Sequence, residues 1–147
     1  MEISDVLSED MVLADYTADS KRQLLEGISS FIAQKKHFDK NAVFEAMLER
    51  ENLGSTGYGN GVAFPHARIQ GLDKIVTVFV RLNKAIDYDA MDSKPVDLLA
   101  VMVSPENSGD DHLRTLSAFS RTMKNENTCN AIRHAKSAHE IYVALHG

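Results

Sequence analysis

Residues 96–103 read VDLLAVMV, and this stretch constrains the fold more than any other. Apart from Asp97 every side chain in it is apolar, so an extended chain here would be hydrophobic on both faces. A strand with two apolar faces is typical of the centre of a sheet that is covered on each side. We therefore expect residues 96–103 to form a central strand with helices on both faces of its sheet.

Two further stretches predict strands of the same sheet. Residues 75–82, within KIVTVFVRL, are rich in β-branched side chains. The two-residue period of a strand would place four of their apolar side chains on one face: Val76, Val78, Val80 and Leu82. Residues 62–64 form a shorter strand-like run.

Helical spacing characterises the chain before these strands. One helix is expected from Ser20, an N-cap with Gln23 as its capping-box partner, to about Lys36. Its apolar stripe has helical spacing: Leu24, Leu25, Ile28, Phe31 and Ile32. A second helix should begin at Asp39 and end before Gly54, with one apolar face: Val43, Phe44, Met47 and Leu48.

Helical spacing returns after the strands. A helix is expected after Gly109, with Asp110 or Asp111 as its N-cap. A last helix opens at Ser137, whose capping-box partner is Glu140. The predicted order is therefore helix, helix, strands, helix and helix, which is typical of a single α/β domain.

Composition narrows the class of protein. The chain has 147 residues, so we expect one domain over residues 1–147. A net charge of -5 creates no field that would attract nucleic acid. The longest apolar run, residues 98–103, is far shorter than the roughly 20 residues of a membrane helix. Residues 1–11 lack a secretory signal, so a cytoplasmic protein is expected, with neither nucleic acid nor membrane as partner.

A glycine-rich stretch, GSTGYGNGVAFPHAR, occupies residues 54–68. It is not a P-loop, because it lacks the lysine that would hold phosphates, and its spacing misses the G-x-G-x-x-G of dinucleotide folds. It also follows a helix and precedes a strand, which reverses the order that nucleotide sites require. Some of its glycines can serve only tight turns. Four glycines with Ser55, Thr56 and Asn60 nevertheless indicate a loop packed closely around something, such as the Pro65-His66 segment.

His66 follows a proline at the end of the strand-like run, where α/β domains usually place their chemistry. A lone histidine is more often structural, and spacing alone leaves both interpretations open. Four other histidines are expected on the surface: His37, His134, His139 and His146. The single cysteine, Cys129, is expected to be a buried apolar residue, and no zinc-ligand spacing occurs, so no metal is expected.

The signature R-E-x-L-G-S-T-G-x-G-x-G-x-A-x-P-H is present from Arg50 to His66. In it the chain resembles the type 2 enzyme IIA components of the bacterial phosphoenolpyruvate-dependent phosphotransferase system. Residues 88–105, YDAMDSKPVDLLAVMVSP, are most similar to the nitrogen-type regulatory enzyme IIA. The chain departs from the family at Tyr58, usually aliphatic, and at Ala67, often glycine. The resemblance implies a single α/β domain whose mixed β-sheet is flanked by helices on both faces.

The resemblance also implies roles for individual residues. His66 matches the histidine that is phosphorylated on Nε2, His112 matches a second active-site histidine, and Arg50 matches an arginine beside the site. The loop around the site would comprise Ser55, Thr56, Gly57, Gly59 and Gly61. The phosphoryl donor would be a dedicated histidine phosphocarrier protein, charged from phosphoenolpyruvate by an enzyme I relative, and no cofactor is implied.

These residue types suit phosphoryl transfer. A neutral imidazole is a competent nucleophile near pH 7 without a separate base. The transition state spreads negative charge over three oxygens, which the Arg50 guanidinium, the loop hydroxyls and backbone N–H groups could stabilise. For His112 a helix start disfavours protonation, whereas Asp110 and Asp111 favour it, so the sequence leaves its protonation state open.

The leading hypothesis is a phosphohistidine carrier that regulates target proteins by its phosphorylation state, rather than an enzyme that turns over a small molecule. Within the same family, a sugar-specific enzyme IIA would pass phosphate to an enzyme IIB for fructose- or mannitol-type uptake. From other classes, a metal-dependent hydrolase could use His66 and His112 with an aspartate. A binding module would leave His66 unused.

Overall fold

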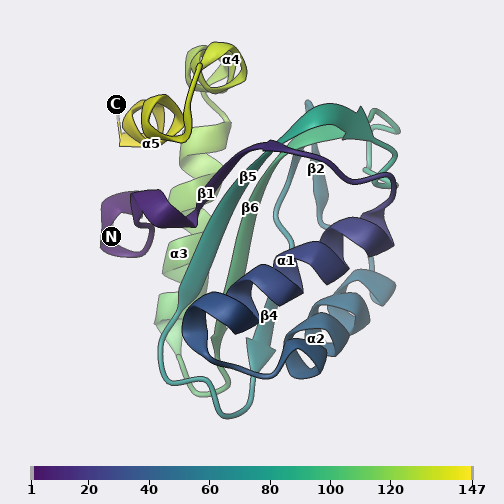
Figure 1. The fold of residues 1–147 in the computed structure, drawn as a ribbon, viewed down its shortest axis with the longest axis vertical. Coiled ribbons are helices and arrows are strands. Elements are labelled where there is room, and N and C mark those ends of the chain that lie inside the picture. Colours follow the sequence, from purple (N-terminus) through teal and green to yellow (C-terminus); the bar gives the residue numbers. More distant parts are fainter. Residues whose placement is uncertain (1, 147) are drawn as a thin grey trace.

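The strands form one mixed sheet in the computed structural model, which describes residues 2–146 (Figure 1). Its strands are β1 (Val12–Tyr16), β2 (Gly57–Gly59), β3 (Val62–Ala63), β4 (His66–Ile69), β5 (Val76–Ile86) and β6 (Val96–Pro105). The helices are α1 (Lys21–Lys36), α2 (Lys40–Asn52), α3 (Asp110–Met123), α4 (Glu126–His134) and α5 (Ala138–His146). Two short 3-10 helices, Ile3–Asp5 and Glu9–Met11, precede β1.

The central position predicted for residues 96–103 is confirmed. β6 pairs antiparallel with β5 on one side, and parallel with β3 and β4 on the other. β1 extends the sheet beyond β5 in parallel, and β2 pairs antiparallel with β3. All six side chains of residues 98–103 are at most 2% exposed, because helices cover both faces.

The segment that pairs in parallel with β6 is interrupted at one place, between β3 and β4. Val62 and Ala63 of β3 pair with Leu98 and Leu99, and β4 resumes the same edge opposite Met102. Between the two strands, residues 64–65 leave the ladder, although Met102 N still donates to the Pro65 carbonyl at 3.0 Å. His66 therefore opens a strand instead of ending one, which corrects the sequence-based placement.

The helices cover the sheet in two groups (Figure 1). α1 and α2 pack together against β5 and β4, whereas α3 lies against β6 and α5 against β1. The predicted caps are present, since the Ser20 hydroxyl accepts from Gln23 N and the Asp39 carboxylate from Asn41 N. The Gln23 side chain accepts from Asp19 N, one residue before the position that a capping box requires.

The predicted order of elements was incomplete. β1 precedes α1, and α4 lies between the two helices expected at the end of the chain. The N-cap of α3 is Gly109, with φ of 60°, and both aspartates proposed for that position lie in the first helical turn. Glycine takes this left-handed φ at little cost, and the first turn favours carboxylates electrostatically.

Two other predictions are confirmed: Ser137 caps α5 through Glu140 N at 3.1 Å, and Cys129 is buried. The four remaining histidines are exposed. Within residues 2–146, every helix is too short or too polar to cross a bilayer.

Candidate active site

An open cleft of 350 Å³ lies where α2, β4 and α3 meet. α2 contributes Ala46, Glu49 and Arg50, and the C-cap residue of this helix, Leu53, also lines the cleft. β4 contributes His66, Ala67 and Arg68, and α3 contributes His112. The cleft thus gathers three of the residues singled out in the sequence, namely Arg50, His66 and His112. They come from segments 16 to 62 positions apart, and the sheet register brings them together.

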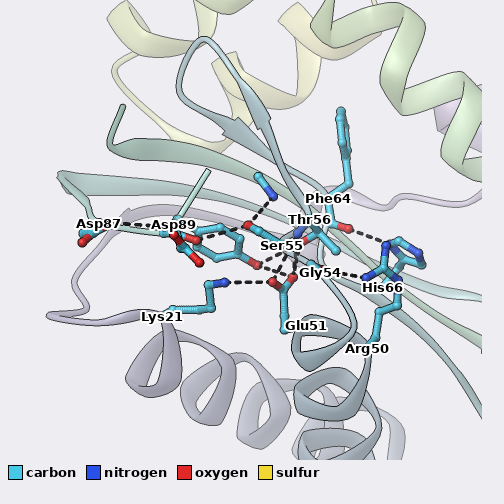
Figure 2. A network of polar contacts seen from close by, with 12 residues as sticks. Lys21, Arg50, Glu51, Gly54, Ser55, Thr56, Phe64, His66, Asp87 and Asp89 are labelled. Atoms are coloured by element: carbon cyan, nitrogen blue, oxygen red, sulfur yellow. Dashed lines mark hydrogen bonds and ion pairs between the residues drawn. The ribbon is translucent and has the colours of Figure 1, made fainter. Parts of the chain in front are cut away.

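His66 has its ring fixed by the main chain. Its Nδ1 lies 2.7 Å from the carbonyl oxygen of Phe64, two residues earlier (Figure 2). A carbonyl can only accept, so in the neutral ring Nδ1 carries the proton and Nε2 keeps its lone pair. Burial lowers the pKa of His66 below its usual 6.5, and the nearby Arg50 lowers it too, although the Phe64 bond and Glu51 act in the opposite direction. His66 is therefore a neutral, half-buried imidazole near pH 7 with Nε2 as its nucleophilic atom.

His112 lies beside His66 and is almost fully buried. The two ring centroids are 5.6 Å apart, with an angle of 63° between the ring planes. Nδ1 of His112 lies 2.5 Å from the hydroxyl oxygen of Ser104 at the end of β6. The pKa of His112 is lowered to about 4, mainly by burial, and next by the positive charge of Arg68 and by the neighbouring His66. The protonation state that the sequence left open is thus the neutral one.

Arg50 brings a cation to the cleft from the last turn of α2. Its Nη1 donates to the carbonyl oxygen of Gly54 at 2.8 Å, which turns the guanidinium toward His66 (Figure 2). A guanidinium has five N–H donors in a planar fork, so most of its donors stay available for an anion. Arg50 is therefore placed to meet negative charge that develops near His66.

Arg68 brings a second cation that the sequence analysis did not identify. It donates through Nη1 to the Ser108 hydroxyl at 2.9 Å and through Nη2 to the Gly109 carbonyl at 3.5 Å. These bonds join β4 to the start of α3 and so hold the two histidine-bearing elements together. Its position two residues after His66 on one strand, hence on the same face, is a signal that could have revealed it.

Glu51, the neighbour of Arg50, is the centre of a buried polar network (Figure 2). Its carboxylate accepts from Lys21 Nζ at 3.0 Å, from the Tyr88 hydroxyl at 3.0 Å, and from both the backbone N–H and the hydroxyl of Thr56. The side chain of Glu51 is only 3% exposed. Burial, and next the charge of Glu51, raises the pKa of the Tyr88 hydroxyl far above its usual value. A buried carboxylate with these four donors fixes α2, α1 and the glycine-rich loop relative to one another.

The Glu51 network continues to His66 through the main chain. Thr56, held by Glu51, accepts a hydrogen bond from Phe64 N on its carbonyl oxygen at 3.0 Å. The carbonyl of Phe64 in turn accepts from His66 Nδ1. The orientation of the His66 ring is therefore connected to the buried carboxylate by three consecutive hydrogen bonds.

The loop hydroxyls bond mainly to Glu51 and Tyr88, outside the loop, and they do not line the cleft. Thr56 is buried against Glu51 and Tyr88, and Ser55 Oγ accepts from Gly57 N at 3.0 Å and donates to the Tyr88 carbonyl at 3.3 Å. Direct contact of these hydroxyls with a phosphoryl group stays a prediction. In the described structure their bonds shape the segment that leads into Phe64.

The glycines of the loop serve close packing. A Cβ on Gly57 would lie 2.7 Å from the backbone of Ala90. Gly61 has φ of +81°, and a Cβ there would meet Arg133 at 2.6 Å and Asp97 at 2.8 Å. Gly59 approaches Asp92. These three glycines seat the β2–β3 hairpin against its neighbours, and none of them lines the cleft.

The described residues offer no group of three or more histidine, cysteine, aspartate or glutamate side chains arranged to hold a metal ion. The cleft places the imidazoles of His66 and His112 beside the guanidinium groups of Arg50 and Arg68. A neutral nucleophilic nitrogen beside two fixed cations suits the transfer of an anionic group.

Comparison with known proteins identifies the family to which the chain is similar. The family model for the phosphoenolpyruvate-dependent sugar phosphotransferase system, EIIA 2, matches residues 5–146. A nitrogen regulatory protein of Bradyrhizobium diazoefficiens is 36% identical over 145 residues, covering 99% of this chain and 95% of the relative. A fructose-specific EIIA component of Haloferax volcanii is 39% identical over 107 residues, covering 73% of this chain and 70% of that one.

The fold agrees as well. The crystal structure of the nitrogen regulatory protein IIA-Ntr from Neisseria meningitidis superimposes with a TM-score of 0.92 at 31% identity, covering 97% of this chain and 98% of that one. The expected mixed sheet with helices on both faces is thereby confirmed. The chain belongs to the type 2 enzyme IIA family of the phosphoenolpyruvate-dependent sugar phosphotransferase system, and it is similar to the nitrogen regulatory members over nearly its whole length.

Proposed function

We propose that the protein accepts a phosphoryl group on Nε2 of His66 from a histidine phosphocarrier protein of the nitrogen-type system, and that its phosphorylation state regulates target proteins. The phosphoryl group would come ultimately from phosphoenolpyruvate. The observation that carries the proposal is the bond between His66 Nδ1 and the Phe64 carbonyl, which leaves Nε2 as the free nucleophile in a cleft with two arginines.

The transfer is a displacement at phosphorus. His66 Nε2 donates its lone pair to form a new N–P bond, while the N–P bond to the carrier's histidine breaks and its electron pair stays on that imidazole. Negative charge on the three phosphoryl oxygens is greatest near the transition state. The guanidinium groups of Arg50 and Arg68 line the cleft and would stabilise that charge.

Exposed apolar side chains beside the cleft support a protein as the phosphoryl donor. Leu53, at the end of α2, is 82% exposed, and Leu113, next to His112, is 61% exposed. Large apolar side chains on the rim of a polar site are typical of surfaces that dock another protein. A carrier seated on both leucines would bring its phosphohistidine over His66.

Regulation follows from charge. A phosphoryl group at His66 adds about -1.5 to -2 charges at the mouth of the cleft. The cleft is lined by Leu53, and Leu113 follows the cleft residue His112, so a partner that covers these leucines would meet this charge. A target that binds the same surface would therefore discriminate between the phosphorylated and unphosphorylated forms.

The proposal is tested by incubating the protein with phosphoenolpyruvate, enzyme I and the phosphocarrier, followed by intact-mass measurement. We expect one acid-labile phosphoryl group on the wild type and none on His66→Ala. His37→Ala removes an exposed histidine that is not among the residues lining the cleft, and it should be phosphorylated like the wild type. An unchanged mass of the wild type would refute the proposal.

A sugar-specific enzyme IIA is a second candidate, favoured by the similarity to the fructose-specific component of Haloferax volcanii. In that case phosphorylated His66 would pass its phosphoryl group to a cysteine on an enzyme IIB. If His66 is phosphorylated with a labelled phosphoryl group, that group should then transfer to a fructose- or mannitol-type IIB within the time of a single turnover. Retention of the label on His66 would favour the regulatory function.

A further inference from the structure

Ser104 is a buried polar residue that the proposed transfer does not yet use. It is the second-last residue of β6, its exposed fraction is 0%, and the strand around it is otherwise almost entirely apolar. Among residues 2–146, the only hydrogen-bond partner of its hydroxyl is Nδ1 of His112, at 2.5 Å. A fully buried hydroxyl at such a position calls for an explanation, because burying it costs free energy unless its bond is made.

The direction of this hydrogen bond follows from what each alternative would leave unpaired. If His112 Nδ1–H donated, the hydroxyl proton of Ser104 would be buried without an acceptor among the described residues. If Ser104 donates, its proton is satisfied and its oxygen keeps unused lone pairs. The ring proton of His112 is then on Nε2, which is not a buried orphan because His112 lines the open cleft. Orphaned buried donors are rarer and more costly than under-used acceptor oxygens. Ser104 is therefore the donor and His112 Nδ1 the acceptor.

The direction of the bond fixes the tautomer of His112. A neutral imidazole carries one ring proton, so a ring whose Nδ1 accepts must be protonated at Nε2. The ring is neutral because burial lowers its pKa, and Arg68 and His66 on β4 lower it too. Arg50 on α2 also opposes protonation, whereas Asp110 and Asp111 on α3 favour it. His112 then presents an N–H donor at its second nitrogen.

The two histidines of the cleft consequently hold opposite tautomers. His66 is protonated at Nδ1 by its bond to a backbone carbonyl, and its Nε2 is a nucleophile. His112 is protonated at Nε2 by its bond from a serine hydroxyl. Both rings line the same cleft, and their centroids are 5.6 Å apart.

We infer that Ser104 is a positioning residue, which holds His112 as the Nε2–H tautomer so that this N–H donates to a phosphoryl oxygen on His66. The inference rests on the proposed phosphorylation of His66. With the tautomer reversed, a nitrogen lone pair would face the anionic oxygens and repel them. Ser104 would thus raise the rate of transfer through His112 without contacting the phosphoryl group.

The first test measures the tautomer directly, in the unphosphorylated protein. Long-range ¹H–¹⁵N NMR spectra of protein labelled in its histidines should show His112 at pH 7 as the Nε2–H form in the wild type. In Ser104→Ala we expect a substantial population of the Nδ1–H form, and Ser104→Thr, which keeps the hydroxyl, should restore the wild-type tautomer. A His112 that is Nδ1–H in the wild type, or unchanged in Ser104→Ala, overturns the inference.

The second test measures single-turnover phosphorylation by the carrier. We expect Ser104→Ala to slow transfer by about tenfold, the magnitude of one lost charge-assisted hydrogen bond, and Ser104→Thr to recover most of the rate. Thr77→Val is the matched control, since it removes another buried hydroxyl, from β5, whose bond is to the Val6 carbonyl. An equal slowing in Thr77→Val would mean that Ser104 acts only through stability, and would overturn the inference.

The two proposals fail separately. A wild type that shows the Nε2–H tautomer, shifted by Ser104→Ala, but that takes no phosphoryl group contradicts the proposed function and the role of Ser104 in transfer. A wild type that is phosphorylated on His66 but holds His112 as Nδ1–H contradicts the inference alone.

Discussion

The two sides of the cleft hold their histidines by different means. On the α2 side, His66 is fixed by a backbone carbonyl, and that carbonyl is connected through Thr56 to a buried carboxylate, Glu51. On the α3 side, His112 is fixed by a single side-chain hydroxyl, that of Ser104. The orientation of the nucleophile, His66, thus depends on a network that involves several elements, whereas the orientation of His112 depends on one hydrogen bond.

The difference has a chemical reason. A carbonyl oxygen accepts only, so the His66 tautomer cannot reverse while the loop keeps its shape. A hydroxyl can donate or accept, so the His112 tautomer depends on which proton would otherwise be left unpaired. The α2 side should therefore respond to substitutions mainly through stability and geometry, and the α3 side mainly through protonation.

The largest effect is expected from removing the centre of the α2 side. Glu51→Ala leaves Lys21, Tyr88 and Thr56 without their shared acceptor, and breaking a buried ion pair in this way costs about 3–5 kcal/mol. Urea denaturation would measure the loss of unfolding free energy. Glu49→Ala, an exposed carboxylate on the same helix, should change it by less than about 0.5 kcal/mol. Similar small effects for both variants would show that the network does not hold this side together.

A smaller effect is expected from Arg50. Arg50→Ala removes a cation beside the developing phosphoryl charge and should slow phosphorylation of His66 about 10²-fold, with little change in stability. Arg50→Lys keeps the charge but loses the planar fork, so an intermediate rate is expected. Arg22→Ala makes the same change of charge at an exposed position on α1 and should leave the rate unaltered. A wild-type rate in Arg50→Ala would show that Arg50 does not stabilise the developing phosphoryl charge.

The smallest effect concerns the pH dependence of stability on the α3 side. The pKa of His112 is about 4 in the folded protein and about 6.5 when unfolded, so the unfolded state binds the proton more readily. The contribution of neutral, buried His112 to the free energy of unfolding is fully present above about pH 6.5. It is lost as pH falls toward 4, with a loss of about 2 kcal/mol at pH 5.

His112→Gln removes this titration, so the difference in unfolding free energy between pH 7 and pH 5 should be smaller in the variant than in the wild type. Equal differences in the two proteins would mean that His112 is not held in its neutral form by the fold.

Elements with a strong local signal were predictable from the sequence. α1 and α2 have clear apolar stripes and N-caps, so their bounds were confirmed. β6 is apolar on both faces, so its central position was confirmed, although it runs two residues beyond the predicted end at residue 103. β1 was missed because it is short and contains Asp15 at φ of 57°, and it is defined by its pairing with β5, far along the chain. α4 was missed because only Cys129 and Ile132 of its nine residues are buried.

The site residues that belong to motifs were predictable from the sequence. The hydrogen-bond partners that hold them, which are distant in sequence, were not. Arg50, His66 and His112 were identified, and the cleft brings them together. Nothing local connects Ser104 to His112 or Glu51 to Tyr88, because the sheet register and loop packing create those contacts. The glycines indicated a closely packed loop but not what it packs against, since neighbours such as Ala90 and Arg133 lie 33 and 72 residues further on.

The central claim, that Nε2 of His66 is the phosphoryl acceptor, can be measured directly. Phosphorylated protein labelled with ¹⁵N in its histidines would be examined by NMR for the nitrogen that couples to ³¹P. We expect coupling to Nε2 of His66, because Nδ1 is held by the Phe64 carbonyl. Coupling to Nδ1 of His66, or to either nitrogen of His112, would contradict it.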